Sequence, residues 1–285
     1  MAHWPPAFGY TQVGGGRSSS LSRYLWTTVT ADATAHVKGA WTELIASTPF
    51  PIQVLRLVFN GSQLTASDTA MLLDVGTGES PDEKVLIENI ACGHIYVGGF
   101  SGSSRPPRVL DLPVSIPAGT RIVARTQAII GSDTISVSTD YFGGMPAGGL
   151  AFGGRWQTFG ADVATSRGVA PIAGATAHTK GATWETLVSS TAFPIRALAV
   201  SVQGRDGALN NATQLTDIGI GGAALEKVLI PDIQTTTDSN DGMQLWTHGY
   251  FPLALPIPAG SRLSVRTQSS SALEQKVDWI VHGLG

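Results

Sequence analysis

The sequence predicts an all-β protein built from two tandem β-sandwich domains of the jelly-roll kind, with an extended N-terminal arm. Three observations predict this fold class. One set of sequence blocks occurs twice in the same order, apolar and polar residues alternate in short segments, and turn-forming residues are abundant, with 34 Gly and 16 Pro among 285 residues. Apolar residues make up 42% of the chain, which is enough to fill the interior of two domains.

Five blocks indicate the duplication, because each returns 141 to 143 residues later and their order does not change. The blocks are TAHVKGA at 34–40 and TAHTKGA at 176–182, FPI at 50–52 and 193–195, LLDVGTG at 72–78 and LTDIGIG at 215–221, EKVLI at 83–87 and 226–230, and IPAG at 116–119 and 257–260. A period this long indicates a duplicated domain, because the units of solenoid proteins run to about 20–50 residues.

The duplication divides the chain into four parts. We expect an N-terminal arm at 1–30, a first sandwich at 31–142, a Gly-rich linker at 143–170 and a second sandwich at 171–285. The linker is expected to hold no more than one short ordered segment. Each copy has about 110 residues, the size of an ordinary domain, so each should enclose a core of its own.

Segments of alternating character predict seven strands in the first copy, and none of them requires a helix longer than a turn or two. The segments are 41–47, 54–60, 70–76, 84–90, 110–116, 121–127 and 134–140. The residues 39–47 leave a helical alternative open. Many short strands in about a hundred residues are typical of a β-sandwich, and a jelly roll is the nearest variant.

Alternation that survives in both copies identifies the faces that point into the core. The predicted core-facing residues are Leu55, Leu57, Phe59, Ile122, Ala124, Ile135, Val137, Thr139 and Tyr141 in the first copy, and Leu198, Val200, Val202, Leu263, Val265, Val277, Trp279 and Val281 in the second. The opposite faces carry Arg56, Arg125 and Gln127, and their counterparts, among others.

The repeated IPAG segment is interpreted as a turn. Pro117 fits the second position of a type I turn, because its fixed φ suits that position, and Gly119 fits the fourth. A phosphate-binding loop would need more glycines, a Lys-Ser/Thr pair and a following helix. The strand after the turn carries Arg125, whose counterpart is Arg266, and we interpret both as residues of a solvated strand edge that remain candidates for partner contacts.

The other repeated titratable residues are interpreted as structural. His36 and His178 lack the orienting acid and the nucleophile that a catalytic histidine needs, so each ring is expected to bond to backbone. Asp74 and Asp217 are expected to bond the backbone of the following turn, and Glu83 is expected to lie in a solvated turn. No catalytic residue, cofactor or metal site is predicted.

The two copies differ most between the VLI strand and the IPAG turn, and loops on a rigid scaffold often carry function. Candidate contacts with a partner or ligand in this region are Tyr96, Arg105, Arg108, Trp246, His248 and Tyr250. The alternative is that these loops vary without a role. The residues DSNDG at 238–242 begin like a calcium loop, but Gly249 stands where a bidentate glutamate is required.

Composition excludes several classes of protein. The net charge is −3 and the basic residues are scattered, so no nucleic-acid partner is expected. No segment approaches the roughly 18 apolar residues of a membrane helix, and residues 1–20 lack the pattern of a secretory signal, so neither membrane insertion nor export by the general secretion route is expected. The single cysteine, Cys92, excludes an internal disulfide.

The blocks TAHVKGAWTELIAS, LLDVGTG, EKVLI and LPVSIPAGTRIVARTQ together resemble a domain found in virion proteins of tailed bacteriophages. The resemblance covers both copies and leaves out the arm and the linker. It implies a β-sandwich component of a virion, often oligomeric, and it brings no catalytic residues with it.

We therefore expect a structural protein that is not an enzyme and belongs to the tail fibre, baseplate or another tail-attached part of a phage virion, where it would contact the host surface. It would be assembled in the host bacterial cytoplasm. Its expected partners are other virion proteins, further copies of itself, with a trimer as the first expectation, and a host surface glycan. Alternatives are a capsid decoration or head-fibre protein and a free carbohydrate-binding protein. A glycoside hydrolase would need two facing carboxylates.

The N-terminal arm is the remaining candidate for a contact. It carries Trp4, Phe8 and Tyr10 among prolines, and it has too few apolar residues to form a core alone. Exposed aromatic residues are frequent anchors of protein interfaces, so we expect the arm to dock on a neighbouring subunit.

Overall fold

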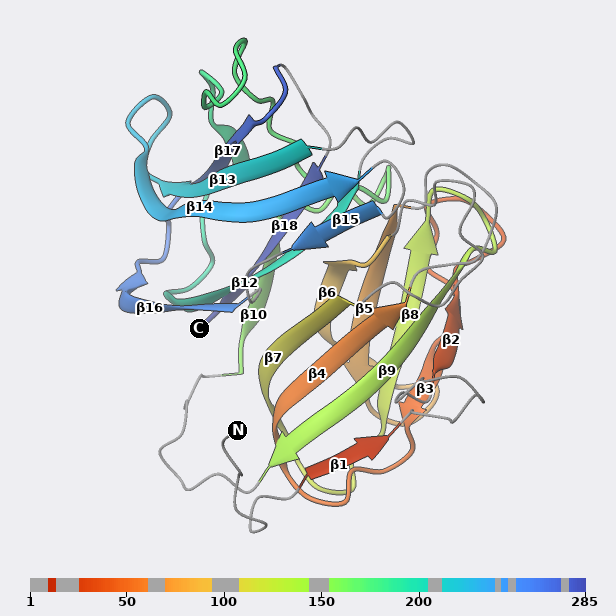
Figure 1. Cartoon of the computed structure of the whole chain (residues 1–285). Helices are drawn as coiled ribbons and strands as arrows, with labels where there is room; N and C mark the ends of the chain where they lie inside the picture. The colour runs from red at the N-terminus through yellow and green to blue at the C-terminus, as the bar shows by residue number, and fades with distance from the viewer. Residues whose placement is uncertain are drawn as a thin grey trace, which may run out of the picture.

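The prediction of an all-β fold made of two tandem sandwiches is confirmed by the computed structural model, which describes residues 10–13, 26–60, 70–93, 108–143, 154–204, 212–238, 242–245, 250–272 and 277–285. Within these ranges there are eighteen strands and no helix, and therefore no helix that would span a membrane. Figure 1 shows two bodies, the first from red to yellow-green and the second from green to blue.

The first sandwich consists of two antiparallel sheets. The β9 sheet has the order β1-β9-β4-β7, with β2 also paired to β9, and the β8 sheet has the order β3-β8-β5-β6. Their strands are β1 (Tyr10–Val13), β2 (Thr27–Thr30), β3 (Thr42–Ile45), β4 (Ile52–Asn60), β5 (Met71–Thr77), β6 (Lys84–Ala91), β7 (Arg108–Ile116), β8 (Ile122–Ala128) and β9 (Thr134–Gly143).

The second sandwich repeats this arrangement. The β18 sheet has the order β10-β18-β12-β16, and the β17 sheet has the order β11-β17-β13-β14-β15. Their strands are β10 (Trp156–Phe159), β11 (Glu185–Val188), β12 (Ile195–Gly204), β13 (Ala212–Ile220), β14 (Lys227–Asp238), β15 (Gly242–Leu245), β16 (Tyr250–Ile257), β17 (Leu263–Ser269) and β18 (Val277–Leu284).

Both sandwiches have jelly-roll connectivity, in which the chain crosses repeatedly between two facing antiparallel sheets, here one of five strands and one of four in each copy. The seven strands predicted in the first copy are all present, and the ambiguous segment 39–47 contains strand β3. Further strands come from the segments expected to be an arm and a linker: β1 and β2 pair with β9, and β10 pairs with β18. These pairings cover edges of β9 and β18 whose backbone groups would otherwise lack partners.

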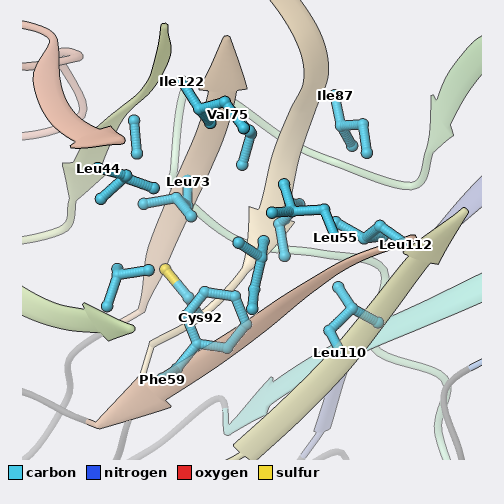
Figure 2. Packing of buried hydrophobic residues seen from close by; sticks show 14 of the residues in the cluster. Leu44, Leu55, Phe59, Leu73, Val75, Ile87, Cys92, Leu110, Leu112 and Ile122 are labelled. Carbon is cyan, nitrogen blue, oxygen red and sulfur yellow. The ribbon is translucent and has the colours of Figure 1, made fainter. Parts of the chain in front are cut away.

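The first core lies between the β9 and β8 sheets and is almost entirely aliphatic. Figure 2 shows Leu55 of β4 beside Leu112 of β7, its partner in the sheet, and the Cys92 thiol beside the Phe59 ring. Cys92 is a free, buried cysteine. The predicted core-facing residues of this copy are buried, which confirms the alternation argument.

The second core is confirmed in the same way along β12, β17 and β18, with Trp279 as its largest fully buried side chain. One end of it is polar. Gln214 stands where the first copy has Met71, because each pairs with the last residue of the neighbouring strand: Gln214 with Ser269 of β17, and Met71 with Ala128 of β8. Within the described residues, the buried Gln214 Nε2 has no hydrogen-bond partner.

Candidate functional site

A buried carboxylate on the outward side of the β8 sheet gathers most of the repeated residues. Asp74 Oδ1 accepts hydrogen bonds from Lys38 Nζ at 2.7 Å and from the Asn89 amide at 2.9 Å, while Asp74 Oδ2 accepts from Arg125 Nε at 3.0 Å. Only 4% of the Asp74 side chain is exposed. Two cations and a backbone amide thus take the place of the water that would otherwise surround this carboxylate.

The strand register explains how these residues meet. Asp74 of β5 lies directly opposite Arg125 of β8. On its other side the β5–β6 pairing is irregular at Asp74, and Asn89 has a positive φ of 56°, which turns its amide toward the carboxylate. The guanidinium carbon of Arg125 lies 4.5 Å from the centre of the Trp41 ring, a cation–π contact.

The second sandwich contains the same cluster. Asp217 accepts from Lys180 Nζ at 2.7 Å, from the Asp232 amide at 3.0 Å and from Arg266 Nε at 3.0 Å. Arg266 stacks on Trp184 at 4.4 Å. We call these two sets the Lys–Asp–Arg–Trp clusters: Lys38, Asp74, Arg125 and Trp41 in the first copy, and Lys180, Asp217, Arg266 and Trp184 in the second.

A glycine two residues after each aspartate makes room for the tryptophan ring. A Cβ atom on Gly76 would stand 2.8 Å from Cη2 of Trp41, and a Cβ atom on Gly219 would stand 2.6 Å from Cζ3 of Trp184. Both distances are shorter than a carbon–carbon contact allows. The DVG and DIG blocks are therefore repeated because aspartate and glycine serve the same cluster.

Electrostatics fits a structural role for the clusters. Burial alone would raise the pKa of Asp217, but hydrogen bonds from Lys180, from the Asp232 amide and from Arg266 lower it below its usual value. Burial lowers the pKa of Lys38, and Asp74 opposes that effect. Because fixed donors hold the Asp217 carboxylate and lower its pKa, this residue is poorly suited to exchange protons during catalysis.

A second ion pair is repeated in both sandwiches, Arg121 with Glu83 and Arg262 with Glu226. Arg121 donates to Glu43 Oε2 at 2.9 Å, to Glu83 Oε1 at 3.1 Å and to the carbonyl of Gly78. In the second copy Arg262 donates to Glu226 and to the carbonyl of Gly221. Hydrogen bonding to Arg262 lowers the pKa of Glu226.

The interpretations of these charged residues from the sequence were partly wrong. Arg125 does not lie at a solvated strand edge, because it binds the buried Asp74, and Glu83 does not lie in a solvated turn, because only 6% of its side chain is exposed. Asp74 bonds to the bulge residue of β6 and not to the following turn. A ring nitrogen of His36 lies 3.1 Å from the Ser166 hydroxyl and not against backbone.

Each IPAG segment forms a turn in the structure, as the sequence predicts. Gly119 has a φ of +77° and Gly260 of +81°, a conformation that favours glycine. The amide of Gly119 donates to the carbonyl of Thr48 at 2.7 Å, and that of Gly260 donates to Thr191 at 2.8 Å.

The two sandwiches meet along a polar seam that sequence reasoning missed. Gln203 Oε1 of β12 accepts from the amides of Met71 at 3.0 Å and Gly93 at 3.1 Å in the first sandwich. The amide of Ala91 donates to Ser201 Oγ at 3.0 Å. Side chains of the second sandwich thus bind backbone amides at the start of β5 and at and just after the end of β6. The two sandwiches are therefore joined by specific contacts as well as by the linker.

His282 lies at the centre of this seam and is fully buried. Its Nδ1 is 3.1 Å from Thr158 Oγ1, and its Nε2 is 3.0 Å from Ser201 Oγ. Thr158 Oγ1 also donates to the carbonyl of Glu88 in the first sandwich at 2.7 Å. Burial lowers the pKa of the His282 imidazole to about 3, so the ring is neutral at ordinary pH.

The outward face of β12 held the sequence signal for the seam. Ala197, Ala199, Ser201 and Gln203 alternate with the core residues of β12, and none of them is charged. A solvated strand face normally carries charged residues, so a run of small and neutral side chains indicates a covered face.

The residues predicted as external contacts fall into three groups. Trp4, Phe8, Tyr96, Arg105, Trp246 and His248 lie outside the described residues, and for Tyr10 in β1 and Arg108 in β7 only the backbone is described. Tyr250 of β16 packs against the first core, and burial raises the pKa of its hydroxyl to about 12. Arg125 and Arg266 each keep 31% of the side chain exposed while bound to an aspartate.

A metal centre is not formed by the described residues, among which no three His, Cys, Asp or Glu side chains are grouped for one. The DSNDG segment lies largely outside them. The carboxylates of the two Lys–Asp–Arg–Trp clusters belong to different sandwiches, and each is bound to its own lysine.

No family model matches the chain, and no curated protein matches it. Solved structures that resemble it distantly include PNGF-II (10% identity, TM-score 0.40, covering 91% of this chain and 64% of that one). Another is a chain of Sulfolobus Turreted Icosahedral Virus, at 9% identity and a TM-score of 0.35, with 97% of this chain and 89% of that one covered. A third is PNGase F, a glycosylasparaginase from Flavobacterium meningosepticum, at 12% identity and a TM-score of 0.31, with 90% of this chain and 95% of that one covered. The chain thus spans less than two thirds of PNGF-II, and similarity this low establishes no shared function.

These neighbours correct one expectation. The sequence predicted a protein that is not an enzyme. The solved structures that resemble the chain, however, include enzymes as well as virus proteins: PNGase F, a glycosylasparaginase, and an asparagine amidase. The exclusion was wrong, because a fold of this general kind does not by itself separate enzymes from structural proteins.

Proposed function

We propose that this chain is a structural component of a virus particle, more specifically of the tail fibre, baseplate or another tail-attached part of a tailed phage. The proposal rests on where the residues of the repeated sequence blocks lie in the structure, namely in the Lys–Asp–Arg–Trp clusters. The blocks that resemble phage virion proteins supply Lys38, Asp74 and Arg125, which bond to one another in the first jelly roll. Their counterparts form the same bonds in the second jelly roll. The resemblance therefore concerns the scaffold itself.

The seam supports the same proposal. Gln203 and Ser201 of the second jelly roll accept hydrogen bonds from amides of the first, and Thr158 donates one to it, so the two jelly rolls are fastened together. Jelly rolls occur in viral capsid proteins and in lectins. A pair of joined jelly rolls is a rigid building block, which a particle component requires.

The finer parts of the proposal concern place and partners. The protein assembles in the bacterial cytoplasm, joins other virion proteins and further copies of itself, and contacts a host surface glycan. Capsid decoration and head fibres are alternatives within the same class.

Quantitative mass spectrometry of purified particles tests the proposal. We expect the chain in gradient-purified particles at a fixed ratio to the major capsid protein, and we expect the ratio to survive a high-salt wash. Loss of the chain in the wash, or its recovery only in the soluble fraction, would contradict the proposal. Binding of the purified protein to host cells, with unrelated cells as the control, tests the attachment role separately.

A further inference from the structure

The hydrogen bonds around His282 form one continuous chain that begins and ends on strand β6 of the first sandwich. The amide of Ala91 donates to Ser201 Oγ at 3.0 Å, and Ser201 Oγ lies 3.0 Å from His282 Nε2. On the other side of the ring, His282 Nδ1 lies 3.1 Å from Thr158 Oγ1, which donates to the carbonyl of Glu88 at 2.7 Å. The imidazole therefore links two points of β6 through hydroxyl groups of β12 and β10.

The direction of each bond in this chain is fixed by the groups at its ends. A carbonyl can only accept, so the Thr158 hydroxyl gives its single hydrogen to Glu88, and His282 Nδ1–H must donate to Thr158. In the neutral ring Nε2 carries no hydrogen, so it accepts from the Ser201 hydroxyl, whose oxygen accepts from Ala91. This pattern satisfies both ring nitrogens, and it is possible only while the imidazole is neutral.

Protonation of the ring would break this pattern. A hydrogen on Nε2 would point at the hydrogen of the Ser201 hydroxyl, so the serine would have to turn and leave its hydrogen without an acceptor in the chain. The ring is fully buried, and both of its described partners are neutral hydroxyl groups. A buried cation without an anionic partner is costly, which agrees with the lowered pKa of this residue.

Comparison of the two copies shows that this histidine belongs to the seam. In the first sandwich the register brings three charged residues into one row across β7, β4 and β9: Asp111, Arg56 and Asp140. The same row of the second sandwich, across β16, β12 and β18, consists of Tyr250, Ala199 and His282. Charged residues are thus replaced by neutral ones on the sheet that the other sandwich covers.

Each sandwich keeps a core of its own if the seam opens. Three residues of the second sandwich lie against the first core, namely Ala199, Trp156 and Tyr250. The second core contains no residue of the first sandwich. Separation of the sandwiches therefore exposes the seam without dismantling either core.

We propose that protonation of His282 releases the second sandwich from the first, so that acid separates the two jelly rolls while each remains folded. In the separated form the ring can bind a proton in water, and in the joined form it cannot, so proton binding favours separation. This inference goes beyond the proposed function and does not depend on it.

Other titratable groups surround the seam, so the effect of His282 has to be isolated from theirs. The turn at 161–168 also belongs to the seam, because it bonds to Gln127 of the first sandwich. The charged groups of this turn and of the strands around His282 are Lys84 and Glu88 on β6, Arg155 before β10, Arg196 on β12, Asp278 on β18, and Asp162 and Arg167 in the turn. A second histidine, His36, contacts Ser166 of the turn.

The size of the effect follows from the two pKa values of the ring. In the joined form the pKa is about 3, and in the separated form the ring is expected to return to its usual value of 6.5. The joined form is therefore most stable above the higher value and loses stability as the pH falls toward the lower one. Between about pH 7 and about pH 4.5 the equilibrium constant for opening should rise about fifty- to a hundredfold through His282.

Hydrogen exchange at three amides of the first sandwich reports opening of the seam. They donate to Gln203 or Ser201 of the second sandwich, and they are the amides of Met71, Ala91 and Gly93. Their protection factors are measured by NMR and corrected for the intrinsic exchange rate at each pH. We expect all three to fall together by about fifty- to a hundredfold between about pH 7 and about pH 4.5.

Amides inside the first sandwich distinguish separation from unfolding. Leu55 and Leu57 lie in the central strand β4, between β7 and β9 of the same sandwich. Their amides should stay at least about a hundredfold better protected than the three seam amides at every pH, because separation leaves β4 paired.

Two variants assign the effect to one histidine. His282→Gln should lose the fifty- to hundredfold fall, whether its seam is closed or already open at about pH 7, because glutamine does not titrate. His36→Asn is the matched control, since it removes the other histidine at the seam and asparagine tolerates the positive φ of 64°. It should retain the fall.

Three results would overturn the proposal. The first is wild-type protection at the seam amides that does not change with pH. The second is the same pH dependence in wild type and His282→Gln. The third is equal protection of the seam amides and the β4 amides, which would mean that acid unfolds the protein as a whole.

Discussion

Acidification should weaken the protein through His282, because this buried ring resists protonation in the folded state. Its folded pKa is about 3, against a usual value of 6.5. A group whose folded pKa is depressed binds its proton only after unfolding. Stability is therefore highest above the unfolded pKa, falls as the pH drops below 6.5, and levels off near 3.

The size of this effect follows from the shift. Each pKa unit corresponds to about 1.4 kcal/mol, so lowering the pH from about 8 to about 4.5 should remove about 2 to 3 kcal/mol of the free energy of unfolding through His282 alone. Other groups titrate in this range as well. The comparison must therefore be made between wild type and His282→Gln, whose amide does not titrate.

Urea denaturation at a series of pH values is the assay. At about pH 8 His282→Gln should be less stable than wild type, because the glutamine cannot reach both Thr158 and Ser201. The gap should narrow by about 2 to 3 kcal/mol as the pH falls to about 4.5. Parallel profiles for the two proteins would refute the argument that the buried ring sets this part of the pH dependence.

Three further substitutions test the scaffold. Asp217→Asn should lower the free energy of unfolding by about 2 to 3 kcal/mol, since Arg266 loses its anion and Lys180 keeps only the exposed carboxylate of Asp232. An unchanged urea midpoint would contradict the cluster. Gly219→Ala should lower the free energy of unfolding by about 1 to 3 kcal/mol and shift the tryptophan fluorescence, because the new Cβ displaces Trp184. An unaltered spectrum and melting temperature would contradict the packing of Trp184 on Gly219. Gln214→Met copies Met71 from the first sandwich and should stabilise the protein by about 1 to 3 kcal/mol in chemical denaturation, because it removes a buried amide nitrogen without a partner in the described residues. A loss of stability would show that the amide is satisfied.

The sequence predicted the sandwich class because its signals are local or repeated. Alternation of apolar residues along 198–202 and its counterpart 55–59 identified the faces that point into the core. The duplication strengthened this prediction, because the same alternation occurs in both copies. The first strands of each jelly roll were missed, because β1, β2 and β10 are short and become ordered by pairing with β9 and β18, which are distant in sequence.

The contacts of the charged residues were hidden for a related reason. Asp74, Arg125 and Lys38 are far apart along the chain and meet only through the register of β5 with β8 and the irregularity opposite Asn89. Neither register nor bulge can be read from a single strand. The repeat of each residue type was the available signal, and it indicated a shared role without identifying the partners.

An image reconstruction of the particle tests the central claim most directly. We expect density for two joined jelly rolls per chain, packed as in the structure, at a tail-attached position of the virion. Purified particles whose density is fully accounted for by other chains would contradict the claim that this protein is a structural component of the particle.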